Sequence, residues 1–227
     1  YPVIAMDDPR AFELKSSTDP LAINGDYALT IFGHFNHENA AAALLATAWL
    51  ETPRNHMKES LSKCVIPGRM TLFDLPNGAL AFVDFAHNYL SLLSMGQLAK
   101  EIRPHGKAIV MTGSAGGKAL SRRKDMGLAI TQIYDVAILT SDDPNFENPN
   151  AIADEIQQAI ENPEVAVYRE MDREQAIYLA LSLAGPQDVV VLAGKGNEAS
   201  MKIEGHDAPY DGDAIYAQKW IATQKEA

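Results

Sequence analysis

The sequence has one cysteine, no excess of positive charge and no long apolar run, and each shortage excludes a class of protein. A single cysteine, Cys64, cannot build a disulfide framework or a cysteine-based zinc site, so we expect a reducing, cytoplasmic environment. The formal net charge of -11 disfavours a nucleic-acid or anionic-membrane surface. No apolar stretch approaches the roughly 18 residues of a membrane span. We therefore expect no nucleic-acid partner, no membrane association and no metal site in the chain.

The first ten residues, YPVIAMDDPR, also lack a starting Met, a basic stretch and an apolar core. They do not resemble a signal peptide, and we expect the chain to be a piece of a longer protein. Its 227 residues, of which 47% are hydrophobic, suffice for one large or two small domains with a sizeable core.

From about residue 79 onward, short apolar runs alternate with segments of helical periodicity. Strands are predicted at 79–86, 108–114, 136–141, 165–170 and 188–195. Helices are predicted at 89–102, 121–133, 150–162 and 173–184, with Asn150 and Asp172 as N-caps of the last two. Apolar strands that alternate with helices indicate a parallel sheet covered on both faces. The predicted fold is therefore a doubly wound α/β domain.

The first 65 residues follow a different pattern. The segments 11–18 and 26–33 predict antiparallel strands, and the Ala- and Leu-rich segment 36–51 predicts a helix. A turn is predicted at 75–80, between MTLFD and the first apolar strand. We place the domain boundary between residues 65 and 66.

Four of the five predicted strands are followed by polar, charged or glycine-rich segments. These segments are DFAHN (84–88), TGSAGGKALSRR (112–123), SDDPN (141–145) and AGKGNE (193–198). Ligands of open parallel sheets bind at the carboxyl ends of the strands, so the four segments predict a site there. Taken singly, each is equally well explained as a solvated turn. GSAGGK matches neither nucleotide-binding consensus, and a lone His87 is more often structural than functional. A non-catalytic module that binds a nucleotide through this glycine-rich loop nevertheless remains an alternative hypothesis.

The order and spacing of the motifs resemble the Mur ligases of peptidoglycan synthesis. The motifs are GHFNHENAAAALLA (33–46), IPGRM (66–70), VDFAHN (83–88), GSAGGK (113–118), SRR (121–123), TSDDPNFENP (140–149), DRE (172–174) and LAGKGNE (192–198). The resemblance implies that 1–65 is the tail of the family's central ATPase domain. It implies that 66–227 is the Rossmann-like, amino-acid-binding C-terminal domain, a mostly parallel sheet with helices on both faces.

The same resemblance implies an ATP-dependent, amide-forming ligase that acts on UDP-MurNAc-L-Ala-D-Glu through an acyl phosphate. Its substrates would be this UDP-MurNAc-dipeptide and an amino acid, and its cofactors would be ATP and Mg²⁺. The enzyme would be a monomer and would lie in the cytoplasm. The sequence contains no P-loop, so we expect the chain alone to be inactive and most Mg²⁺ ligands to lie outside it.

The resemblance also assigns roles to individual residues, although none is assigned as catalytic. Those expected to bind ATP are Arg69, Asp84, His87, Asn88, Asn36 and Asn39. Those expected to bind the amino acid are Lys118, Asp142, Asp143, Asn145, Gly194 and Glu198.

The loop SDDPN suggests which amino acid is bound. The diaminopimelate-adding branch of the family has D-N-P-R here, and its arginine can grip a distal carboxylate, whereas this chain has Asn145. Lys118 stands where that branch has another arginine. We expect an anionic pocket in which Asp142, Asp143 or Glu198 pairs with the side-chain ammonium of L-lysine. L-Ornithine or meso-diaminopimelate, and a ligase similar to folylpolyglutamate synthase or cyanophycin synthetase, are the alternatives.

Overall fold

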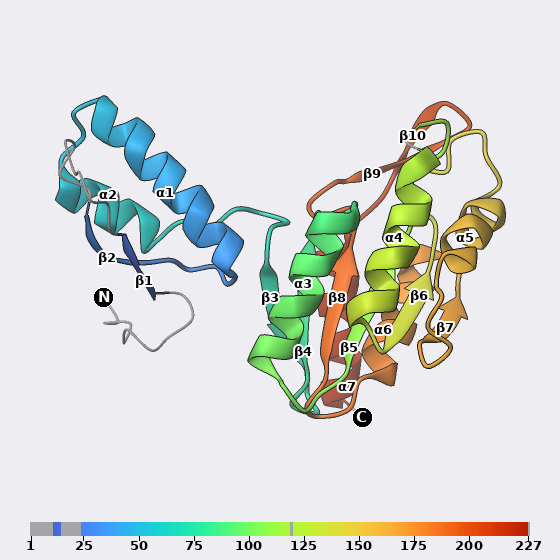
Figure 1. The fold of residues 1–227 in the computed structure, drawn as a ribbon. Coiled ribbons are helices and arrows are strands. Elements are labelled where there is room, and N and C mark those ends of the chain that lie inside the picture. The colour runs from blue at the N-terminus through green and yellow to red at the C-terminus, as the bar shows by residue number, and fades with distance from the viewer. Residues whose placement is uncertain (1–10, 15–23, 119, 227) are drawn as a thin grey trace. The chain divides into compact units, whose positions relative to one another are not determined.

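The computed structural model describes residues 11–14, 24–118 and 120–226, which Figure 1 shows as ribbons. The chain divides into two compact units, residues 1–66 and 67–227. Among the described residues, no helix is both long enough and apolar enough to cross a bilayer.

The described residues of the first unit form one small sheet and two helices. Strand β1 (Ala11–Leu14) pairs antiparallel with β2 (Gly25–Ala28), and helices α1 (His34–Trp49) and α2 (Arg54–Leu61) follow. Tyr27, Leu44 and Met57 form its small buried core. The predicted strand pair and the Ala-rich helix are confirmed, α2 was not predicted, and residues 15–18 of the first predicted strand lie outside the described residues.

The second unit is built on a six-stranded sheet of order β3-β4-β8-β5-β6-β7. Its strands are β3 (Thr71–Asp74), β4 (Leu80–Asp84), β5 (Ala108–Thr112), β6 (Val136–Leu139), β7 (Ala166–Arg169) and β8 (Val189–Ala193). The edge strand β3 joins β4 through the predicted turn and pairs antiparallel with it, and the other neighbours pair parallel. The predicted, mostly parallel α/β sheet is confirmed.

Helices cover both faces of this sheet (Figure 1). One layer holds α3 (Tyr89–Ile102), α4 (Leu120–Ile133) and α5 (Pro149–Gln158), and the other holds α6 (Arg173–Leu183) and α7 (Asp213–Glu226). Ala81 and Val83 of β4 pack in one core cluster with Ile177 of α6, whereas Phe82 between them is buried outside that cluster. Burial on both faces explains why these strands are apolar along their whole length.

Three details of the second unit differ from the sequence prediction. The side chain of Asn148, not Asn150, caps α5, and Pro149 takes the first helical position, where a missing N–H costs no hydrogen bond. Asp172 caps α6 as predicted. After β8 the chain forms an unpredicted antiparallel hairpin, β9 (Ser200–Ile203) and β10 (His206–Pro209), and then the unpredicted helix α7.

Candidate functional site

A pocket of about 100 Å³ opens where β4, β5, β6 and β8 end, and we call it the strand-end pocket. Its wall includes five of the six residues predicted to bind an amino acid, namely Lys118, Asp142, Asp143, Gly194 and Glu198. Its wall also includes His87 from the predicted ATP set. Segments that are far apart in the sequence therefore meet at one pocket, at the predicted edge of the sheet.

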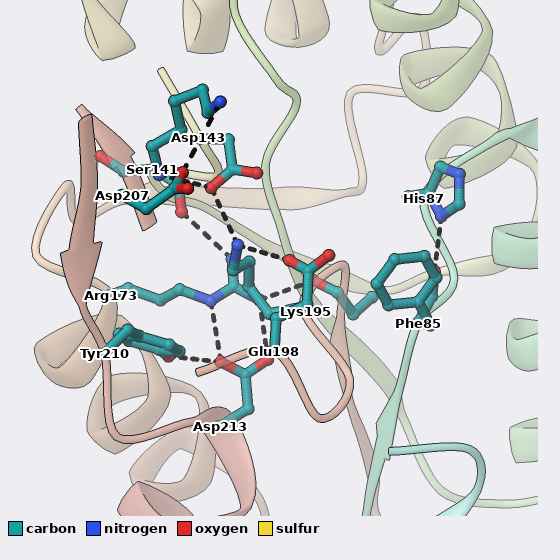
Figure 2. A network of polar contacts seen from close by, with 12 residues as sticks. Phe85, His87, Ser141, Asp143, Arg173, Lys195, Glu198, Asp207, Tyr210 and Asp213 are labelled. Carbon is teal, nitrogen blue, oxygen red and sulfur yellow. Dashed lines mark hydrogen bonds and ion pairs between the residues drawn. The ribbon is translucent and has the colours of Figure 1, made fainter. Parts of the chain in front are cut away.

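Lys195, which the sequence analysis did not assign, already pairs with two of the predicted substrate-binding carboxylates. Its Nζ lies 2.8 Å from Oδ1 of Asp143 and 2.5 Å from Oε2 of Glu198, and Figure 2 shows the ammonium between them. Burial opposes the charge of Lys195, but the two carboxylates outweigh it and raise its pKa. Burial likewise opposes ionisation of Asp143, yet Lys195 and the Lys202 N–H hold the pKa of Asp143 below its ordinary value. The pocket is therefore less anionic than the sequence suggested.

Asp142 is the carboxylate of this pocket that stays unpaired. It is 8% exposed, and no residue that the structure describes donates a hydrogen bond to it or forms an ion pair with it. Burial raises its pKa to about 6, against the opposing charges of Arg173 and Lys195. Gly194 gives it room, because a Cβ there would lie 2.4 Å from Oδ2 of Asp142.

The same pocket carries positive charge as well. Lys118 and Arg122 both line it, and neither forms an ion pair within the described ranges. A wall with both free cations and a free carboxylate suits a small zwitterionic ligand, which carries both charges itself.

The predicted ATP-binding residues of the second unit divide into two groups. The carboxylate of Asp84 accepts the N–H groups of Met70 and Ala86, each at 2.9 Å, and burial raises its pKa in spite of both bonds. The side chain of Asn88 caps α3. Both side chains therefore satisfy the protein's own backbone.

The other two residues of that set, Arg69 and His87, lie at the edge of the pocket. The guanidinium carbon of Arg69 lies 4.9 Å from the ring centroid of Phe85, which is itself a lining residue. Nδ1 of His87 lies 2.6 Å from the carbonyl oxygen of Phe85. These three residues form a cationic and aromatic edge that suits a nucleotide.

Asn36 and Asn39 lie in the first unit, on α1. Nδ2 of Asn36 donates to the carbonyl of Phe32 at 2.6 Å, and Nδ2 of Asn39 donates to Oδ1 of Asn36 at 3.3 Å. Their role in binding ATP stays a prediction.

The glycine-rich loop 113–118 holds an anion, but one of the protein's own. The N–H of Gly117 donates to the carboxylate of Glu147, which also pairs with buried Arg123 at 2.9 Å. Glu155 binds the other end of the same guanidinium at 2.9 Å. Backbone N–H groups of glycine-rich loops bind anions, and here the anion is the carboxylate of Glu147.

Asn145 differs from the other predicted residues. Its side-chain oxygen accepts the N–H of Gly205 in the hairpin, at 2.9 Å, and the residue lines a separate cavity of about 1160 Å³ beside the 144–150 loop. The sequence placed it in the pocket wall, and the structure turns its side chain to the hairpin.

Arg173 fixes the two strand ends that carry the pocket. It is 3% exposed and binds both oxygens of Asp213, at 2.8 and 2.7 Å, as Figure 2 shows. It also donates to the carbonyls of Ser141, at 3.1 Å, and Ala193, at 2.9 Å. These carbonyls directly precede Asp142 and Gly194.

Over the described ranges, no group of three or more His, Cys, Asp or Glu side chains is placed to hold a metal ion.

Asp142→Asn is expected to stabilise the fold in a pH-dependent way. A buried carboxyl whose pKa rises from 3.8 to about 6 is harder to ionise in the folded than in the unfolded chain, so its ionised form lowers stability. At pH 8 the variant should gain about 2–3 kcal/mol of unfolding free energy, and the gain should shrink between pH 6 and pH 4. Urea titrations of both proteins at pH 4, 6 and 8 measure this. A gain that is equal at all three values would contradict the burial of an unpaired charge.

Residues 68–196 match the family model described as Mur ligase, glutamate ligase domain. An Enterococcus faecalis protein named UDP-N-acetylmuramoyl-L-alanyl-D-glutamate--L-lysine ligase is 40% identical over 96% of this chain and 43% of its own length. A Streptococcus sanguinis protein of the same name is 42% identical over 94% and 44%. The chain thus spans less than half the length of these relatives.

A solved structure described as UDP-N-acetylmuramoyl-L-alanyl-D-glutamate--2,6-diaminopimelate ligase has the same fold. It aligns with a TM-score of 0.67 and 27% identity, over 90% of this chain and 42% of that one.

Proposed function

The chain belongs to the Mur ligase family, and from this premise we propose that it forms the C-terminal, amino-acid-binding part of a cytoplasmic, monomeric L-lysine-adding ligase. The whole enzyme would join L-lysine to UDP-MurNAc-L-Ala-D-Glu in peptidoglycan synthesis, using ATP and Mg²⁺. Residues 1–65 would be the tail of its central ATPase domain, and residues 66–227 its C-terminal domain. The names of the relatives support L-lysine as the substrate.

The observation that carries the proposal is the free carboxylate of Asp142 in a pocket that also holds free cations. Lys195 already pairs with Asp143 and Glu198, so Asp142 is the carboxylate left to pair with the side-chain ammonium of lysine. Lys118 and Arg122 would bind its α-carboxylate. Two points of opposite charge fix the position of the amino acid between them.

The positioned amino acid then reacts with an activated dipeptide. ATP would supply the phosphoryl group that activates the D-Glu carboxylate, and most of the residues that carry out this step would lie outside this chain. The lone pair of the lysine α-nitrogen attacks the acyl carbon, the carbon–oxygen bond to phosphate breaks, and the amine proton passes to solvent. This chain would contribute orientation and exclusion of water, and we expect no ligase activity from it alone.

Asp142→Asn, made in the ligase that contains this chain, tests the proposal. We expect the KM for L-lysine to rise about 10- to 100-fold, because a charge-assisted hydrogen bond is lost, and the KM for ATP to change less than about threefold. In the wild type the KM for L-lysine should rise as the pH falls through about 6, where Asp142 becomes protonated, and the variant should lose this dependence.

Asp154→Asn is the matched control, since Asp154 forms an exposed pair with Arg169 on α5 and β7. It should leave both KM values unchanged. Equal changes in the KM for L-lysine and for ATP in Asp142→Asn would remove Asp142 from the amino-acid site.

A further inference from the structure

We infer that the β9–β10 hairpin positions the acidic wall of the strand-end pocket, and that Asn145 controls amino-acid affinity through this hairpin without entering the pocket. The inference rests on the proposed function, because it concerns the affinity of the same pocket for L-lysine. It arises from a set of hydrogen bonds between the 143–145 loop and hairpin residues 202–205, which we call the loop–hairpin contact.

Asn145 makes three of these hydrogen bonds. Its N–H donates to the carbonyl of Lys202 at 2.9 Å, and its carbonyl accepts the N–H of Glu204 at 2.8 Å. Together these two bonds form a parallel β-bridge between Asn145 and Ile203. Its side-chain Oδ1 accepts the N–H of Gly205 at 2.9 Å. The side chain that the sequence placed beside the substrate is therefore used to hold the hairpin turn.

Asp143 extends the loop–hairpin contact into the pocket. One oxygen, Oδ1, accepts both the N–H of Lys202, at 2.8 Å, and the ammonium of Lys195, at 2.8 Å. Lys195 in turn binds Glu198, which also lines the pocket. The hairpin, the Asp143–Lys195–Glu198 group and the pocket wall thus form one continuous hydrogen-bonded structure, and Figure 2 shows the contacts of Lys195 with Asp143 and Glu198.

The backbone of the loop explains why Asp and Asn occupy these positions. Asp143 has φ 45° and Asn145 has φ 54°, in the left-handed region that Asn and Asp tolerate better than other non-glycine residues. Such a conformation persists only where the surroundings hold it, and the loop–hairpin contact supplies four hydrogen bonds that do so. Movement of the hairpin would therefore change the direction of the Asp143 carboxylate and, with it, the position of Lys195.

This arrangement changes the explanation of substrate choice at position 145. An arginine has no acceptor for the Gly205 N–H, so it cannot replace Asn145 in the loop–hairpin contact. We therefore expect Asn145→Arg to weaken L-lysine binding without creating efficient use of meso-diaminopimelate.

The test uses two substitutions at position 145 in the ligase that contains this chain. Asn145→Gly keeps the left-handed backbone but removes Oδ1, and we expect it to raise the KM for L-lysine about fivefold, with kcat and the KM for ATP unchanged. Asn145→Asp keeps an acceptor at the same place and should leave the KM for L-lysine within about twofold of the wild type. If the role of Asn145 were purely structural, Asn145→Gly would lower the melting temperature but would not change the KM for L-lysine more than the KM for ATP.

Asp207→Asn is the control within the same hairpin. Asp207 lies on β10, is 67% exposed, and contacts Lys202 at 3.6 Å, so its loss should leave the KM for L-lysine unchanged. Amide hydrogen exchange supplies a second readout. The Gly205 N–H should exchange faster in Asn145→Gly than in the wild type, and its exchange rate in Asn145→Asp should equal that of the wild type.

Two results would overturn the inference. One is a wild-type KM for L-lysine in Asn145→Gly, and the other is an Asn145→Arg enzyme that uses meso-diaminopimelate efficiently and keeps its affinity for L-lysine. A wild-type ligase that does not use L-lysine at all would contradict the proposed function instead, so the two failures are distinct.

Discussion

Arg173→Met is expected to lower the free energy of unfolding by about 3–5 kcal/mol, because it leaves the buried carboxylate of Asp213 without its cation. The two side chains are 1% and 0% exposed, and their shortest contact is 2.7 Å. Burial opposes the charge of Arg173, but Asp213 outweighs it and raises the pKa of Arg173. The same substitution leaves the carbonyls of Ser141 and Ala193 without their donor, so the strand ends beside the pocket should loosen.

Urea unfolding measures this loss, and Asp211→Asn provides the comparison. Asp211 also precedes α7 and pairs with Lys219, but that pair is exposed, so its removal should leave the unfolding midpoint unchanged. Similar midpoints for Arg173→Met and the wild type would show that the buried pair does not hold the strand ends.

Lys195→Met is expected to cause the second-largest loss of stability, about 2–3 kcal/mol near pH 8. The value is below that for Arg173 because Glu198 is 39% exposed and solvent screens its charge. Folding lowers the pKa of Asp143, so the stability that this carboxylate contributes is present above its unfolded pKa and is lost as the pH falls through its folded pKa. The difference between variant and wild type should therefore shrink toward pH 3.

Denaturant titrations of Lys195→Met at pH 8 and pH 3 test this expectation. Lys118→Met is the matched control for stability, because Lys118 lines the same pocket and forms no ion pair within the described part of the chain. A loss in Lys195→Met that is the same at both pH values would mean that packing of the alkyl chain, and not its charge, supports the pocket.

The parallel sheet was predictable because four of its strands, β4, β5, β6 and β8, are buried and therefore apolar along most of their length. The β9–β10 hairpin was not, since SMKIEGHDAP has few apolar residues and its position depends on hydrogen bonds to a distant loop. Helix α7 did leave a signal that the prediction missed. Ala214, Ala217 and Ile221 recur at helical spacing and pack in the core of the second unit.

The site was predictable as far as the polar segments at the strand ends, because parallel strands bring their carboxyl ends to one edge. The direction of each side chain there was not. Lys195 lies between glycines directly after an apolar strand, and nothing in the sequence shows that its ammonium turns inward to Asp143. The orientation of Asn145 depends on Gly205, sixty residues later in the chain.

The position of the amino-acid side chain in the ligase bound to its tripeptide product tests the central claim most directly. Its crystal structure should place the lysyl ammonium within hydrogen-bonding distance of Asp142 in the strand-end pocket, and the α-carboxylate beside Lys118 and Arg122. A lysyl side chain in the cavity lined by the 144–150 loop, with Asp142 unoccupied, would contradict the account.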